Sequence, residues 1–290
     1  MSAIAKDIPA SMSAGIYADL PANEYHAGPG VSSTMLKDML RSPLHCWARH
    51  LDPERPQSTP TPAMQLGSAV HTAVLEPERW DQEYAVAPRC DRRTKAGKET
   101  WAEFQASAGG RVVLTEDQAE LVSRVAAATA EHPSAREMLQ VGDAETSIFH
   151  DHPCGELVKV RPDWWARGQY LLDLKTTRNA GPGFARQIAQ LNYHMQAAFY
   201  VDVVEAVRGE TLPWYWLAVE TEPPYAVGVY QADAEMLSRG RELYRQALSL
   251  YAVCRQTGQW PGYSEKAQVI RLPGWALHDE DRDFLDDPEF

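Results

Sequence analysis

The chain has 290 residues, 44% of them hydrophobic, and a formal net charge of −12. Its length and apolar content are sufficient for one large domain with a buried core. The acidic charge argues against a protein that coats nucleic acid by bulk electrostatics, but it is compatible with an enzyme that has a local basic channel.

Signals for a membrane or an oxidising compartment are not found in the sequence. No apolar run is long enough to span a bilayer, and residues 1–16 lack the basic start and apolar region of a secretory signal. The cysteines form no C-x-x-C pair, so neither a zinc knuckle nor an iron–sulfur cluster is expected. Free thiols in a reducing cytoplasm are the simplest interpretation. The cysteines are Cys46, Cys90, Cys154 and Cys254.

The N-terminal part of the chain is predicted to be helical after an irregular start. Residues 1–16 are small and polar and are expected to form a flexible tail. Residues 17–31 are interpreted as a structured loop. Residues 32–51 are predicted to form two helices, the second of which begins at Pro43. Residues 52–62 contain four prolines and are typical of a linker or loop.

An apolar helix is predicted over residues 63–76 and ends at Pro77. It contains His71, four residues after Gly67. A histidine on an apolar helix is more often a satisfied core residue than a functional one. The small residues around Gly67 would let a backbone or a ligand approach that side of the helix.

The densest basic stretch lies at residues 89–98. It is open to two interpretations, a solvated loop or a mobile arm that grips phosphates. Amphipathic helices are predicted to follow over residues 99–107 and 116–139. The basic residues are Arg89, Arg92, Arg93, Lys95 and Lys98.

The central stretch, residues 155–177, is predicted to fold as two strands of a hairpin. A three-residue loop centred on Gly168 would place Asp163 opposite Asp173, with Lys175 on the same face as Asp173. A preceding strand is predicted over 143–150 and would carry Glu145.

Two close carboxylates and a lysine suit a divalent cation that acts on a phosphate. The cation relieves the repulsion between the carboxylates, and Mg²⁺ takes a few carboxylate oxygens with water and phosphate. The alternative interpretation is a hairpin with ordinary surface charges, which is the commoner meaning of an isolated D-x-K. His150 and His152 resemble a metal cluster, but they lie at a turn and no third ligand accompanies them.

The C-terminal half continues the alternation of helices and strands. Gln196 and Tyr200 lie one turn apart on a predicted long helix, 182–207. Two strands, a further helix and an acidic tail follow, at 213–220, 225–231, 233–257 and 264–290. The element order predicts an α/β fold in which a central mixed β-sheet is flanked by helices, with an N-terminal helical layer. Its parts would be a helical segment over 32–139, a sheet core over 143–231 and the helix over 233–257.

These motifs in this order resemble the PD-(D/E)xK nuclease superfamily, especially its RecB-like branch and the RecE-type exonuclease VIII family of phages and prophages. The resemblance spans residues 17–263, which would form a single domain with a restriction-endonuclease-like nuclease core. The matching elements are Gly67 to His71 (G-x-x-x-H), Pro162-Asp163, Asp173-Leu174-Lys175 (D-x-K), and Gln196 to Tyr200 (Q-x-x-x-Y).

The resemblance implies a magnesium site, with Mn²⁺ as an alternative ion. Asp163, Asp173 and the Leu174 carbonyl would bind the metal, and Lys175 would position or activate the attacking water. His71 would lie at the metal or at the scissile phosphate.

Further residues have less central implied roles. Glu145 would assist the metal, with Glu156 as a competing candidate. Gln196 and Tyr200 would contact the substrate strand. Apart from the resemblance, the composition of residues 89–98 suggests that Arg92 and Arg93 bind DNA phosphates as part of a local basic lining.

The activity implied is hydrolysis of phosphodiester bonds, as stepwise 5′→3′ digestion of linear double-stranded DNA for recombination. The family implies a homotetrameric ring and an annealing protein that takes the resulting single strand. Three alternatives stay open: a RecB-like repair nuclease of other polarity or substrate, a catalytically inactive DNA-binding module, and a small-molecule metal hydrolase that uses His150 and His152.

Overall fold

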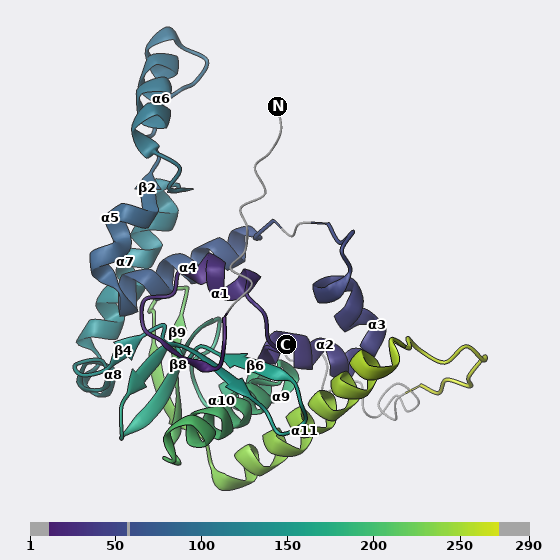
Figure 1. Ribbon diagram of the computed structural model, residues 1–290. Coiled ribbons are helices and arrows are strands. Elements are labelled where there is room, and N and C mark those ends of the chain that lie inside the picture. Colours follow the sequence, from purple (N-terminus) through teal and green to yellow (C-terminus); the bar gives the residue numbers. More distant parts are fainter. Residues whose placement is uncertain (1–11, 57–58, 273–290) are drawn as a thin grey trace.

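A five-stranded mixed sheet lies at the centre of the computed structural model, which describes residues 12–56 and 59–272, and helices cover both of its faces (Figure 1). Strands β8 and β9 are parallel, and the other neighbouring pairs are antiparallel. The predicted α/β fold with a central mixed sheet is confirmed. In spatial order the strands are β10 (Val227–Gln231), β9 (Trp214–Glu220), β8 (Tyr170–Thr177), β7 (Trp164–Ala166) and β4 (Asp143–Ala144).

Apolar side chains of β8 are buried on both faces of the sheet. Leu172 and Leu174 pack with α4 (Pro62–Leu75) and α7 (Glu116–Glu131). Leu171 packs into a second core on the opposite face. Because alternate residues point to opposite faces, Asp173 and Lys175 lie on the same side as Leu171, under the second helical layer.

The second helical layer combines helices from both ends of the chain. Its helices are α2 (Ser33–Arg41), α9 (Phe184–Gln190), α10 (Tyr193–Arg208) and α11 (Ala234–Thr257). The single long helix predicted over 182–207 is therefore wrong. It is divided at Asn192, whose left-handed backbone (φ 53°) cannot continue a right-handed helix.

Residues 32–51 form the two predicted helical segments. Ser32 caps α2 by accepting a hydrogen bond from the Met35 amide. The second segment starts as α3 (Pro43–Cys46) and continues as a π-helical turn (Trp47–Leu51). The segment predicted as one helix over 116–139 is divided by Pro133 into α7 and α8 (Pro133–Met138).

A smaller three-stranded sheet and a short helix near the N-terminus correct three expectations. It consists of β1 (Gly15–Tyr17), β5 (Ser147–Asp151) and β6 (Leu157–Val160). Residues 15 and 16, which were expected to belong to a tail, are thus part of β1. Residues 1–11 of that expected tail lie outside the described residues. The expected loop over 17–31 contains α1 (Ala22–Ala27). The first half of the predicted 155–177 hairpin is β6, which pairs with β5 in this other sheet.

The second half of that hairpin has the predicted register. Trp164 pairs with Leu172, so the next residues outward, Asp163 and Asp173, lie opposite each other. The loop between β7 and β8 has three residues and is centred on Gly168, whose φ of +72° favours glycine. The spacing of the two carboxylates was therefore correctly predicted.

An arm projects from the sheet beyond α4 (Figure 1). Helix α6 (Lys95–Ala108) forms its outer end, and the short parallel strands β2 (Tyr84–Val86) and β3 (Val112–Leu114) connect it to the body. Between α4 and β2 lie a 3-10 turn (Pro77–Arg79) and α5 (Trp80–Glu83).

The chain after α11 packs back on the first helices. The Leu44 amide donates a hydrogen bond to the Pro261 carbonyl, and Arg41 donates one to the Tyr263 hydroxyl. Of the expected acidic tail over 264–290, residues 273–290 lie outside the described residues. Among the helices within 12–56 and 59–272, none combines the length and apolarity that crossing a bilayer requires.

Lys159 of β6 attaches the N-terminal segment to the core. It is 5% exposed, and its Nζ donates hydrogen bonds to the carbonyl oxygens of Tyr25 (2.8 Å) and Gly28 (2.6 Å). We expect Lys159→Met to lower the free energy of unfolding by about 2–4 kcal/mol, because buried acceptors lose a charged donor. Chemical denaturation measures this. Lys95→Met, at an exposed lysine, is the control, and an equal effect of the two would contradict the role of Lys159.

Candidate active site

Asp163 directly precedes β7, Asp173 lies opposite it on β8, and both are buried. They are 8% and 1% exposed. The Leu174 amide donates a hydrogen bond of 2.7 Å to Asp163 Oδ2, which fixes the orientation of that carboxylate. The backbone of β8 thus holds one carboxylate and carries the other.

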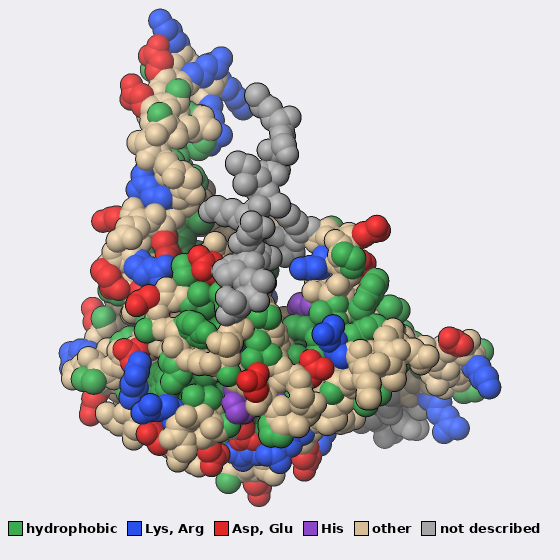
Figure 2. Space-filling view, in the orientation of Figure 1, with side chains coloured by type: hydrophobic (Ala, Val, Ile, Leu, Met, Phe, Trp, Pro, Cys, Tyr) green, Lys and Arg blue, Asp and Glu red, His purple; other side chains and the backbone are tan. Residues whose placement is uncertain are grey.

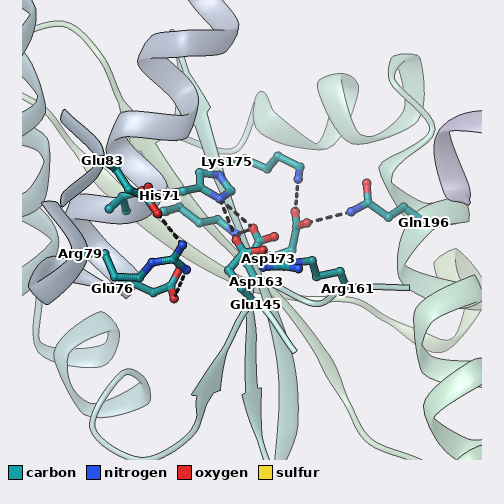
Figure 3. Close-up of polar contacts among 12 residues, drawn as sticks. His71, Glu76, Arg79, Glu83, Glu145, Arg161, Asp163, Asp173, Lys175 and Gln196 are labelled. Carbon is teal, nitrogen blue, oxygen red and sulfur yellow. Dashed lines mark hydrogen bonds and ion pairs between the residues drawn. The ribbon is translucent and has the colours of Figure 1, made fainter. Parts of the chain in front are cut away.

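Asp173 contacts a cation on one oxygen and an amide on the other. Lys175 Nζ lies 2.5 Å from Asp173 Oδ2, and Gln196 Nε2 of α10 donates a hydrogen bond of 2.9 Å to Oδ1. Figure 3 shows Lys175 and Gln196 approaching Asp173 from β8 and α10. Lys175 is therefore placed by an ion pair and a sheet position together.

His71 and Glu145 meet Asp163 from two other elements (Figure 3). His71 Nδ1 on α4 lies 3.6 Å from Asp163 Oδ2 and 3.9 Å from Glu145 Oε1. One ligand atom from each of these three residues lies within 4.8 Å of the others. The histidine that could have been an ordinary core residue thus points at two carboxylates.

Glu145 reaches the cluster because the chain changes sheets at this residue. The strand predicted over 143–150 is divided there into β4 and β5, and Glu145 has φ +49°, a strained conformation for a non-glycine residue. Its amide donates to the Asp163 carbonyl at 3.1 Å. Glu156, the competing candidate for the metal-assisting carboxylate, instead has its Oε2 4.0 Å from Arg255 Nε.

The negative charge of the cluster is incompletely balanced. Burial and the nearby Asp173 raise the pKa of Asp163 to about 7. Burial opposes protonation of His71, but Asp163 and Glu145 outweigh it and raise the pKa of the imidazole to about 9. Without another cation, Asp163 therefore binds a proton more readily than an ordinary carboxylate does, and His71 keeps its proton more readily than an ordinary imidazole.

Lys175 and Arg161 each form an ion pair with a carboxylate of the site. Burial opposes the charge on Lys175, but Asp173 and Asp163 outweigh it and raise its pKa above the usual value. Arg161 is 8% exposed and its Nε lies 2.6 Å from Glu145 Oε2. Burial of Glu145 disfavours its carboxylate, but His71 and Arg161 outweigh this and lower its pKa. Lys175 is thus equipped to donate hydrogen bonds and positive charge rather than to accept a proton.

The donor set of His71, Glu145 and Asp163 fits a divalent cation. Two carboxylates and an imidazole are ligands used by such ions, and burial together with the nearby Asp173 makes the charge on Asp163 unfavourable, as the raised pKa shows, so a cation there would be stabilising. Asp173 lies outside this group of three, and its oxygens contact Lys175 and Gln196. The main-chain amide of Leu174 donates a hydrogen bond to Asp163. Metal binding by the Leu174 carbonyl stays a prediction.

Of the other predicted residues, Tyr200 lies near the cluster and four lie apart from it. Tyr200 is 7% exposed and packs edge-on against Trp214. Burial raises the pKa of its hydroxyl to about 12, and the nearby Asp173 and Asp163 add to this shift. Arg92 and Arg93 lie at the outer end of the arm. His150 and His152 line a separate pocket with Asp202 and Arg245, and His152 contacts Cys154.

Two charged residues at the site were missed by the sequence reasoning. Arg161 alternates with Asp163 along the chain, and this spacing was a signal that it shares the same side. Lys37 on α2 lies 3.5 Å from Gln196 Oε1, and no local pattern connects it with the D-x-K element. Both are brought in by contacts between distant segments.

Comparisons with known proteins show the family and the fold. Residues 32–273 match the family described as PDDEXK-like domain of unknown function (DUF3799). No curated protein gives a significant match. A crystal structure from Eubacterium rectale, provisionally named an exonuclease, is similar with a TM-score of 0.62 at 12% identity, over 88% of this chain and 95% of that chain. The crystal structure of SSO0001 covers 62% of this chain and 85% of its own at 13% identity, with a TM-score of 0.27, which is too low to support an inference.

The Eubacterium rectale structure shows the shared fold, and the family match covers most of the chain. The protein therefore belongs to the family of PDDEXK-like domains, within the PD-(D/E)xK nuclease superfamily.

Proposed function

We propose that the protein is a metal-dependent deoxyribonuclease that digests linear double-stranded DNA, in the 5′→3′ direction, and so produces single strand for recombination. The observation that carries the proposal is the meeting of His71, Glu145 and Asp163 beside the Asp173–Lys175 pair. Family membership and the name of the Eubacterium rectale protein support nuclease chemistry.

Each residue has a distinct task in this proposal. His71, Glu145 and Asp163 hold Mg²⁺ or Mn²⁺, which when bound neutralises phosphate oxygens and lowers the pKa of water. Asp173 joins the metal ligands or orients Lys175, whose ammonium donates to a phosphate oxygen or to the attacking water. Gln196 and Tyr200 of α10 contact the substrate strand, and Gln196 also fixes the Asp173 carboxylate.

The test is incubation with end-labelled linear duplex and with a closed circle, in Mg²⁺ and in EDTA. We expect a ladder from the linear DNA in Mg²⁺ alone, with loss of nucleotides from 5′ ends. Cleavage of the circle or the opposite polarity would favour a RecB-like repair nuclease instead. No digestion under any metal would contradict the proposal.

The arm supports a binding role for Arg92 and Arg93. Figure 2 shows basic side chains gathered at its outer end, over α6. Arg92 Cζ lies 3.3 Å from the centre of the Trp101 ring. The turn at the start of α6 is tightly packed, because a Cβ on Gly97 would lie 1.9 Å from the Asp91 carbonyl oxygen. Basic residues next to an aromatic ring are suited to phosphates and stacked bases.

We expect the double substitution Arg92→Ala/Arg93→Ala to raise KM for duplex DNA about tenfold and to leave kcat nearly unchanged. The salt dependence of 1/KM should become shallower by about two charges, because two phosphate contacts are lost. Arg124→Ala, at an exposed arginine of α7, is the control. An unchanged KM in the double variant would remove the arm from the binding surface.

We further propose a homotetrameric ring, a single-strand annealing protein as partner, and a location in the cytoplasm. A ring that encloses the duplex would bind DNA despite a net charge of −12, because a local basic lining is sufficient. Light scattering of the pure protein at several concentrations tests the tetramer, and a monomer at all concentrations would contradict it.

A further inference from the structure

Lys37 lies next to the candidate active site on the α10 side. Its Nζ is 3.5 Å from Gln196 Oε1, at the limit of a hydrogen bond, and 5.0 Å from the centre of the Tyr193 ring. Lys175 Nζ lies 5.0 Å from the centre of the same ring. Two ammonium groups from α2 and β8 therefore approach one aromatic ring beside Asp173.

The two lysines differ in what balances their charge. Lys175 has Asp173, but within residues 12–56 and 59–272 no carboxylate oxygen lies within 4 Å of Lys37 Nζ. Asp173 lies near Lys37 without forming an ion pair with it, and its oxygens contact Gln196 and Lys175. Lys37 is half-buried, and burial and then repulsion from Lys175 lower its pKa to about 8, so it is still mainly charged at pH 7.

We propose that Lys37 binds a backbone phosphate of the nucleic-acid strand that occupies the site, an inference that rests on the proposed nuclease function. A phosphodiester supplies the anion that the described part of the chain does not give this ammonium. The Gln196 amide, which also touches Asp173, keeps Lys37 at the level of the reacting groups. Lys37 is thus a substrate-binding residue on the side of Asp173 away from the His71 cluster.

A purely structural role for Lys37 makes a different prediction. If Lys37 only supported Gln196, its loss would disturb the Gln196–Asp173 contact and lower kcat. If it binds phosphate, its loss weakens binding, and the effect depends on salt because the contact releases counterions. The two roles are therefore separable by kinetics at several salt concentrations.

The experiment measures kcat and KM for linear duplex in Mg²⁺ over a range of NaCl, for wild type, Lys37→Met, Lys37→Gln and Lys37→Arg. We expect the Met and Gln variants to raise KM about tenfold and to make the plot of log(1/KM) against log[NaCl] shallower by about one. Lys37→Arg should stay close to wild type. Lys266→Met, at an exposed lysine, is the matched control, and melting temperatures show whether each variant folds.

Several results would overturn the inference. They are an unchanged KM and slope in both neutral variants, a fall in kcat alone, or an equal defect in Lys37→Arg. If wild type digests DNA but these variants behave in one of those ways, only the role of Lys37 fails. If wild type neither digests DNA nor shows a measurable KM, the proposed function fails, and the inference fails with it.

Discussion

Substitution of Asp173 by Asn together with Lys175 by Met is expected to reduce magnesium-dependent digestion of linear duplex by at least about 10³-fold. In the proposed reaction the Lys175 ammonium, placed by Asp173, stabilises negative charge at the phosphate. Removal of one such donor lowers the rate by about 10²–10³-fold in comparable sites. Asp173 is buried, and the Lys175 ammonium, on a side chain that is 17% exposed, lies 2.5 Å from its Oδ2. Digestion of an end-labelled duplex, followed over hours, measures the loss.

The double substitution is preferable to either single one for a physical reason. Removal of only Asp173 or only Lys175 leaves the other charge buried and unpaired, which costs about 3–5 kcal/mol and could unfold the protein. Removal of both leaves two neutral side chains of similar shape, so stability should change much less. Thermal unfolding of the three variants checks this order.

The matched control removes an exposed ion pair instead. Arg239 and Glu242 on α11 lie 2.6 Å apart and are each 63% exposed, so Arg239→Met/Glu242→Gln should leave activity and stability nearly unchanged. Persistence of digestion in the Asp173/Lys175 variant would exclude this pair from catalysis. Absence of digestion in wild type as well would favour a catalytically inactive DNA-binding module.

The register of the two central carboxylates was predictable because it depends on local signals. Gly168 marks the turn, the alternation around it sets the faces, and these fix Asp163 opposite Asp173 without any distant contact. The helix starts at Ser32 and Pro43 were predictable for the same reason, since capping and proline geometry act within a few residues.

The other parts of the site depend on distant segments. Lys159 and Arg161 alternate with valines and had the pattern of a half-exposed strand, yet both are buried. The N-terminal segment covers them and supplies carbonyl oxygens as acceptors. Arg161, for example, donates a hydrogen bond of 2.8 Å to the Leu20 carbonyl oxygen. The burial of these two cations is set by residues more than a hundred positions earlier in the chain, which no local pattern indicates.

Two backbone breaks were also beyond local signals. Glu145 and Asn192 have positive φ without being glycine, and each one divides an element that the periodicity predicted as continuous. The break at Glu145 directs its carboxylate to His71, and the break at Asn192 sets where α10 begins. Tertiary contacts override propensity at both positions.

Asp163→Asn is expected to stabilise the metal-free protein while it abolishes digestion. Burial, and then repulsion from Asp173, disfavour the charge of Asp163 in the fold, and these two causes raise its pKa to about 7. An asparagine keeps an oxygen that can accept the Leu174 hydrogen bond but carries no charge. We expect a gain of about 1–3 kcal/mol in the free energy of unfolding at pH 8 in EDTA, since each pKa unit corresponds to about 1.4 kcal/mol.

Divalent ions should reverse the order of stability. An ion that binds only the folded protein stabilises it by about 2.7 kcal/mol at a hundredfold excess over its Kd, so wild type should gain several degrees in melting temperature in Mg²⁺ or Mn²⁺. Asp163→Asn should gain much less. Because His71 contributes a nitrogen donor, the gain should be larger with Mn²⁺ than with Mg²⁺, and His71→Ala should reduce that difference.

Asp143→Asn gives the matched control, because Asp143 is 46% exposed on β4 and pairs with Arg167 at 2.6 Å outside the cluster. It should respond to EDTA and to both ions as wild type does. Equal stabilisation of wild type and Asp163→Asn by Mn²⁺ would mean that the ion binds elsewhere. Lower stability of Asp163→Asn in EDTA would mean that favourable contacts of the Asp163 carboxylate outweigh its repulsion from Asp173. The cluster would then be a structural ion-pair network rather than a cation-binding site.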